Sequence, residues 1–370
     1  MSAGPPGDDR RPRRRAYVDW ARGIAVLLMI EAHTADAWTR LDMRRTTAFR
    51  DATVLGGFAA PLFLWLAGLA VVLAATRAAG RGASRPSAVG MICRRGLEIF
   101  ILAFLFRVQG FIVTPGGHLV TIFRVDILNV MGPSIVAAGL VWGLARTAGA
   151  RVLWYGVIAS AVAMLTPIVR DAGLVDALPV WFQWHLRPAG DLTTFTLLPW
   201  AGFVFAGGAV GVLIEAARGE GSERRLHAIL AGAGAALVAL GFYTAGRPSL
   251  YHASSFWTSS PAWFAIRVGI VMMALSAIYT IAALAERTGV TLGWLERLGR
   301  SSLFVYWIHV ELVYGYASWL WRHRLPLWGT AVAFSVFCAV MYGAVVLRDR
   351  FVGSWRERPR GQLVSAPSNS

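Results

Sequence analysis

The chain has 370 residues, of which 56% are hydrophobic and 15% are charged, and its formal net charge is +16. The apolar residues gather into stretches of about 20, the length at which a helix crosses a bilayer. No segment between these stretches is long enough to form a soluble domain of useful size. We therefore exclude a soluble globular protein, and with it the nucleic-acid partner that such a basic charge would otherwise suggest.

These stretches predict an all-α fold, a polytopic transmembrane helical bundle of about ten spans. The flanks are polar, so residues 1–15 are expected to be a disordered basic tail and 348–370 a polar cytoplasmic tail, with one transmembrane domain at 16–347. The predicted spans are 19–38, 52–75, 89–113, 125–145, 152–168, 194–215, 227–244, 262–285, 301–321 and 327–347.

The distribution of arginine predicts the orientation of the bundle. All 36 positively charged side chains are arginine; with a cytoplasmic N-terminus, 23 fall in inner segments, 12 in outer ones, and Arg22 lies within the first span. By the positive-inside rule both termini are cytoplasmic, as expected for a multi-pass protein of the cell membrane. The N-terminal arginines before an apolar run imitate a secretory signal, but we expect no cleavage. Cys93 and Cys338 both lie in predicted spans, so no disulfide framework is implied.

The first span carries a stripe of ionisable side chains. Arg22 and His33 are separated by eleven positions, which is about three turns, so they share one helix face about 16 Å apart along the axis. Asp19 and Asp36 lie near the same stripe. Because charged groups at membrane depth are costly, this face is expected to border the bundle interior or a wet cavity.

The second span places a proline inside apolar sequence. Pro61 lacks a backbone donor and is expected to bend the helix. Gly57 and Gly68 would allow another span to approach closely.

The third and fourth spans begin with polar residues. Arg94 and Arg95, on the inner side, suit either a bound phosphate or a lipid headgroup. Asp126 and Asn129 are three positions apart near the outer boundary. They either orient a substrate or satisfy one another and Arg124.

The ninth span contains a histidine close to mid-depth. Gly299 breaks the preceding segment and Ser301 is a plausible N-cap. His309 then lies about 12 Å into the bilayer. An intramembrane histidine is expected to be functional, although a structural hydrogen bond is the alternative.

In combination, these segments resemble a superfamily of polytopic membrane acyltransferases. It includes the heparan-α-glucosaminide N-acetyltransferase family and the bacterial O-acyltransferases of acyltransferase family 3. The resemblance covers roughly residues 16–347. Its four motifs are Asp19-x-x-Arg22-Gly23-x-Ala25 followed by His33, Phe58-Ala59-Ala60-Pro61-Leu62-Phe63 followed by Gly68, Asp126-Ile127-Leu128-x-x-Met131-Gly132, and Gly299-Arg300-x-Ser302-Leu303-x-x-Tyr306-x-x-His309.

The resemblance implies a donor and an acceptor on opposite sides of the membrane. Acyl-CoA, most simply acetyl-CoA, would bind from the cytoplasm as a co-substrate, with no permanently bound cofactor and no metal. The acceptor would be a carbohydrate or other glycan-type molecule outside. The overall pattern resembles the heparan branch, whereas a histidine at the position of His33 resembles the bacterial O-acyltransferases, so amine and hydroxyl acceptors both stay open.

These expectations assign a role to each polar residue. Arg22, Arg94 and Arg95 would hold the donor. His33 would take the proton from the acceptor, or carry the acyl group itself. Asp19 could pair with Arg22, and Asp36 could fix the tautomer of His33. The residues expected to contact the acceptor are Asp126, Asn129 and His309.

Two other interpretations remain at this point. Arg22 could be a snorkelling interfacial arginine and His33 a satisfied interhelical hydrogen bond. A proton-coupled transporter or flippase of a polar or lipid-linked solute would use the stripe as a relay, but it predicts ionisable pairs spread over several spans. The expected partners are the lipid bilayer, acyl-CoA and the acceptor. A homodimer is also compatible with the sequence.

Overall fold

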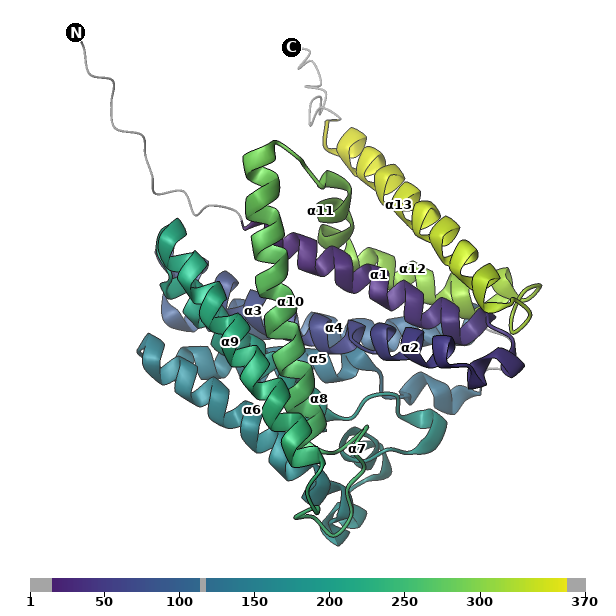
Figure 1. Cartoon of the computed structure of the whole chain (residues 1–370), viewed down its shortest axis with the longest axis horizontal. Helices are drawn as coiled ribbons and strands as arrows, with labels where there is room; N and C mark the ends of the chain where they lie inside the picture. The colour runs from purple at the N-terminus through teal and green to yellow at the C-terminus, as the bar shows by residue number, and fades with distance from the viewer. Residues whose placement is uncertain (1–14, 114–117, 358–370) are drawn as a thin grey trace, which may run out of the picture.

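The computed structural model describes residues 15–113 and 118–357. These residues form a bundle of α-helices (Figure 1), which confirms the predicted all-α fold class. In the described part of the chain, β pairing is confined to two isolated bridges, Thr39 with Leu325 and Val125 with Thr193.

The helices alternate with short connections along the chain. Their bounds are α1 Ala16–Trp38, α2 Thr47–Gly56, α3 Ala59–Gly80, α4 Arg85–Val113, α5 Ile127–Leu144, α6 Ala148–Asp171, α7 Val180–Leu186, α8 Leu197–Ala216, α9 Glu220–Ala245, α10 Pro261–Thr288, α11 Gly293–Arg300, α12 Ser302–Tyr314 and α13 Leu327–Glu357.

Every predicted span overlaps a helix, and eight of the helical segments described are long and apolar enough to cross a membrane. Two predicted spans differ from these eight. The first, α1, is long enough but carries four Asp, Glu or Arg residues in addition to His33. The ninth was expected over 301–321, but α12 ends at Tyr314 after 13 residues, about 20 Å, and α11 precedes it. At the other end, α13 continues to Glu357, past the expected boundary at 347.

The second span differs from prediction at its proline. The helix is interrupted at Gly57 and Phe58, between α2 and α3, and Pro61 lies in the first turn of α3. In a first turn the missing N–H leaves no hydrogen bond unmade, so Pro61 begins a helix rather than bending one. Arg267 of α10 stabilises the break by donating to the Gly57 carbonyl while its guanidinium lies 4.7 Å from the centroid of the Phe58 ring.

Glycines bring several helices into backbone contact. A Cβ at Gly68 would collide with the Val204 backbone of α8, and one at Gly207 would collide with the Trp65 backbone of α3. Small residues are the usual means of close helix packing in membranes. The predicted role of Gly68 is therefore confirmed. Matching glycines join α4 to α5 and α9 to α10, namely Gly96 with Gly132 and Gly234 with Gly269.

The start of α1 lies at the same end of the bundle as the end of α13. A Cβ at Gly299 of α11 would meet the Asp19 carbonyl, so α11 lies directly on the first turns of α1. Arg348 of α13 donates to Ser301 Oγ at 2.8 Å, just after α11. Figure 1 shows α1 crossing the bundle beside α12 and α13. This arrangement agrees with an even number of membrane crossings.

Candidate active site

A cavity of about 1070 Å³ lies beside α1, between α3, α4, α5 and α12. Its lining extends along α1 from Arg22 to Asp36, a distance of about 21 Å by helical rise. His33 lines it between these two residues. The charged stripe predicted for the first span therefore faces a cavity rather than lipid.

The end of the cavity at the start of α1, here called the inner end, has apolar walls and few charges. Arg22 and Arg95 line it together with Ser302 at the start of α12. Arg22 Nη1 lies 3.4 Å from Asp19 Oδ1, so the predicted pair is confirmed. The apolar lining residues here are Ala67, Ala70, Val71 and Ala74 of α3, Ile92 and Ile99 of α4, and Met131 and Ile135 of α5.

The two adjacent arginines of α4 have different surroundings. Arg95 lines the cavity and pairs with Glu98 at 3.2 Å. The Arg94 side chain is 82% exposed, pairs with Glu98 at the same distance, and is not among the lining residues. Of the two arginines, Arg95 thus lies on the cavity and Arg94 does not.

His33 lies against the second intramembrane histidine. His33 Nδ1 is 2.8 Å from His309 Nε2, and the two ring planes differ by only 3°. His309 is completely buried behind His33, and its Nδ1 lies 2.9 Å from the Val305 carbonyl oxygen and 3.0 Å from that of Tyr306. The sequence left a functional role and a structural hydrogen bond open for each histidine; the structure adds that the two form a pair.

Asp36 borders the cavity but is held by residues other than His33. Tyr314 Oη donates to Asp36 Oδ2 at 2.9 Å, and Arg44 Nη2 lies 3.3 Å from Asp36 Oδ1. Among the residues that the structure describes, His33 hydrogen-bonds to His309 instead. Asp36 was expected to hold the ring of His33, three residues before it on α1. His309 of α12 takes that place.

Asp126 and Asn129 form the N-terminal cap of α5. Asp126 Oδ1 accepts from the Ile127 N–H at 2.7 Å, and Asn129 Oδ1 accepts from the Asp126 N–H at 3.0 Å. The expectation that the two satisfy one another is confirmed, but the arginine paired with Asp126 is Arg107 and not Arg124. Asp126 also lines the cavity and is ion-paired with Arg107 of α4, whereas Asn129 is buried and is not among the lining residues.

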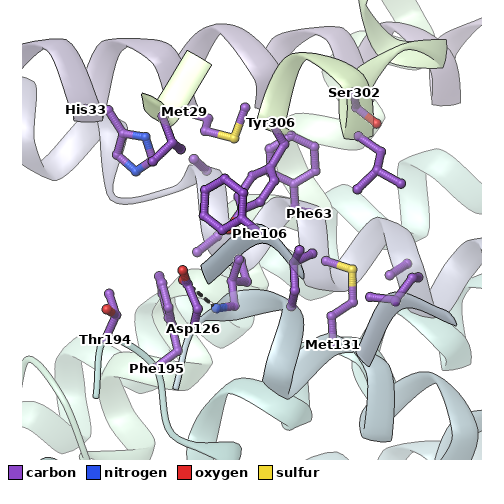
Figure 2. Close-up of a pocket in the computed structure, with 18 of the residues that line it drawn as sticks. Met29, His33, Phe63, Phe106, Asp126, Met131, Thr194, Phe195, Ser302 and Tyr306 are labelled. Atoms are coloured by element: carbon purple, nitrogen blue, oxygen red, sulfur yellow. Dashed lines mark hydrogen bonds between the residues drawn. The ribbon is translucent and has the colours of Figure 1, made fainter. Parts of the chain in front are cut away.

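The opposite, outer end of the cavity is rich in polar side chains. Figure 2 shows His33 on one side of the cavity and Asp126, Thr194 and Phe195 on the other. Arg124 donates to Thr194 Oγ1 through Nε at 3.1 Å and Nη2 at 2.8 Å. Burial, and next the nearby Arg107, lower the pKa of Arg124 below its ordinary value. The other ionisable lining residues at this end are Asp36, Asp191, Glu311, Tyr314 and Arg322.

Three site residues were assigned no role from the sequence. Arg107 is an ionisable residue within a predicted span, which is itself a signal of function. Tyr306 lies one turn before His309 and packs its ring 5.2 Å from that of Phe106. Tyr314 offered no sequence signal, because its partner Asp36 is 278 positions away. In residues 15–113 and 118–357, no cluster of three His, Cys, Asp or Glu side chains could hold a metal ion.

A polytopic bundle of long apolar helices with a histidine on an internal cavity is the architecture of a multi-pass membrane protein with an enclosed site. The family model described as heparan-alpha-glucosaminide N-acetyltransferase, catalytic, matches residues 14–252. The match spans more than half of the chain, so the protein belongs to this family and is a multi-pass membrane acyltransferase. It includes His33 but ends before His309. A search of the curated proteins finds no match.

Proposed function

We propose that the protein transfers an acyl group, most simply acetyl, from cytoplasmic acyl-CoA to a hydroxyl or amine of an extracytoplasmic carbohydrate-type acceptor. The observation that carries this proposal is one cavity lined by Arg22 and Arg95 at its inner end, by polar side chains at its outer end, and by His33 between them. By the positive-inside rule, the inner end faces the cytoplasm of a cell membrane.

The inner end suits the donor. Its apolar walls are compatible with an extended pantetheine arm, and the two guanidiniums can bind phosphate or carbonyl oxygens. Arg22 and His33 are about 16 Å apart along α1, so an arm held near Arg22 can bring its thioester to His33. Arg22 and Arg95 are accordingly proposed as donor contacts.

The outer end suits a hydroxyl-rich acceptor. Asp126, Asp191 and Thr194 line it with side-chain oxygens, and Phe195 adds an aromatic ring. Such a set can hydrogen-bond hydroxyls and stack against a sugar ring, as small-molecule sites usually do with a few polar groups on an apolar wall. Of the predicted acceptor contacts, Asp126 is the one that lines the cavity.

His33 is proposed as the general base. As the acceptor oxygen or nitrogen attacks the thioester carbonyl, a new C–O or C–N bond forms and His33 takes the proton of the attacking group. The C–S bond then breaks, and the departing thiolate takes that proton from His33. The products are the acylated acceptor and free CoA. The two substrates occupy one cavity, which favours direct transfer over an acyl-His33 intermediate.

The test is turnover by the purified protein in detergent. Radiolabelled acetyl-CoA is offered with a panel of amino and hydroxyl sugars, and labelled product is measured for wild type and His33→Ala. We expect product with wild type and a fall of about 10² to 10⁴-fold with His33→Ala, the usual contribution of a general base. Gel filtration and thermal unfolding must show that the variant remains folded.

Two results would contradict the proposal. If folded His33→Ala keeps wild-type turnover, His33 is not the base. If no acyl-CoA binds, but reconstituted vesicles dissipate a solute gradient, the protein is a transporter.

A further inference from the structure

We infer that His309 is a positioning residue that fixes the tautomer of His33, leaving His33 Nε2 as the basic atom on the cavity. The inference rests on the proposed transfer reaction and names the atom that performs it. It follows from two links in a chain of hydrogen bonds: His309 Nδ1 bonds to backbone carbonyls of α12, and His309 Nε2 bonds to His33 Nδ1.

The first step assigns the proton of His309. Its Nδ1 lies 2.9 Å from the Val305 carbonyl oxygen and 3.0 Å from the Tyr306 carbonyl oxygen. A carbonyl oxygen can only accept, so Nδ1 must carry the hydrogen. A neutral imidazole has one N–H, and Nε2 of His309 is therefore a bare acceptor.

The second step passes this assignment to His33. Its Nδ1 is 2.8 Å from His309 Nε2, and one hydrogen must lie between the two nitrogens. Since His309 Nε2 carries none, the hydrogen belongs to His33 Nδ1. The remaining nitrogen, His33 Nε2, then holds a free lone pair on the edge of the ring away from His309.

The third step concerns what happens when His33 takes a proton. The resulting imidazolium still donates from Nδ1 to His309 Nε2, and this bond becomes charge-assisted and stronger. His309 thus stabilises the protonated base, as the aspartate does in a Ser-His-Asp triad, without introducing a second charge into the membrane interior. The complete burial of His309 protects this bond from competing water.

The neighbouring acids Asp36 and Asp126 do not fix the position of the proton on His33. Asp36 is engaged by Tyr314 and Arg44, and Asp126 is engaged by Arg107. Neither has a recorded hydrogen bond to His33 among the described residues. Tyr314 contacts the His33 ring edge-on at 5.6 Å, which restrains its tilt but not its proton.

The direct test is solid-state NMR of the full chain with ¹⁵N-labelled histidine in lipid. Signals of His33 are identified by their loss in His33→Gln. We expect a protonated Nδ1 and a bare Nε2 at neutral pH. A protonated Nε2 in wild type overturns the inference. This measurement needs neither substrate nor turnover, so it stays decisive even if the proposed reaction fails.

Two substitutions provide the functional test. His309→Leu removes the acceptor, and turnover should fall at least about a hundredfold. His309→Gln keeps a carbonyl acceptor near the position of Nε2, and turnover should stay within about tenfold of wild type. Donor affinity, measured with acetyl-CoA alone, should be unchanged in both. Equal losses in the two folded variants, or no loss in His309→Leu, contradict the inference.

Discussion

The two ends of the cavity differ in the way they are built. At the inner end the walls come from alanine, valine and isoleucine, and the charges are the two guanidiniums of Arg22 and Arg95. At the outer end carboxylates, hydroxyls and guanidiniums lie close together, several of them already bonded to one another. Both ends are lined by the same helix, α1.

The proposed function gives this difference a physical reason. An extended, flexible donor arm needs little more than an apolar channel with a charge at its entrance, because few groups must be oriented along it. An acceptor must present one particular hydroxyl or amine to His33, and rigid polar partners fix that orientation. The predictions that follow either disturb one end alone or test whether the ends are independent.

The largest expected effect is on the packing that forms the inner end. Gly299→Leu places a side chain against the Asp19 backbone, and overpacking costs about 1–3 kcal/mol, with the upper end expected for a clash with backbone atoms. We expect loss of folded protein on gel filtration and a lower thermal midpoint. The control is Gly343→Leu on α13, where a Cβ meets nothing within 4 Å. Normal folding of Gly299→Leu would contradict the contact between α1 and α11.

The next effect is on the affinity for the donor. Arg22→Ala and Arg95→Ala each remove a guanidinium from the inner end, and the KM for acyl-CoA should rise about tenfold or more, since charge-assisted hydrogen bonds contribute about 1.5–3 kcal/mol. Arg94→Ala should have a smaller effect because its side chain points outward.

The control for these donor variants is Arg81→Ala, an exposed residue between α3 and α4. The KM for the acceptor should be unchanged in every case. A larger effect from Arg94 than from Arg95 would show that the cavity is not the donor site.

A smaller effect is expected at the outer end. Thr194→Val removes the hydroxyl that holds Arg124, and the loss of about 1 kcal/mol should raise the KM for the acceptor roughly fivefold. The KM for acyl-CoA should not change. Thr288→Val, at the exposed end of α10, serves as the matched control. Equal changes in both KM values would mean that the two ends are coupled.

The smallest effect concerns the outer loop beside the site. Burial lowers the pKa of His185 in α7, and the Trp181 carbonyl partly opposes this. The unfolded loop therefore binds a proton more readily than the folded one. Packing of α7 should be fully stable above about pH 6.5 and weaken as the pH falls below it.

Hydrogen exchange of residues 172–196 at pH 7 and pH 5 measures this change. The quantity compared is the protection factor, which is the exchange rate relative to that of an unstructured chain at the same pH. His185→Gln should abolish the difference in protection between the two pH values, whereas His252→Gln, at an exposed position, should leave it intact. An unchanged difference in His185→Gln would assign the pH response to another group.

Much of the fold could be predicted because the membrane imposes a simple pattern. A span must be about 20 apolar residues long, and the positions of the helices follow from that requirement. The prediction was wrong where local contacts set the ends of helices. The helix is interrupted before Pro61 instead of bending at it, and α12 ends at Tyr314.

The site was predicted where its residues share one helix. Arg22 and His33 were placed on one face by helical spacing alone, and both line the cavity. Arg94 and Arg95 could not be told apart, because neighbouring residues point about 100° apart and the helix is apolar on most sides. Only the packing of α4 against α5 decides which of them faces inward.

By itself, the sequence determined that the chain is a helical membrane protein and that its first span has an ionisable face. Both follow from local properties of the chain: the length of each apolar stretch, and the helical spacing of the charged residues within it. The tertiary structure decided what that face meets. His33 and His309 hydrogen-bond to one another although they are 276 positions apart. Asp36 accepts a hydrogen bond from Tyr314 and not from His33 on its own helix. Contacts between helices depend on how their surfaces fit in three dimensions, and no spacing along one helix encodes that fit.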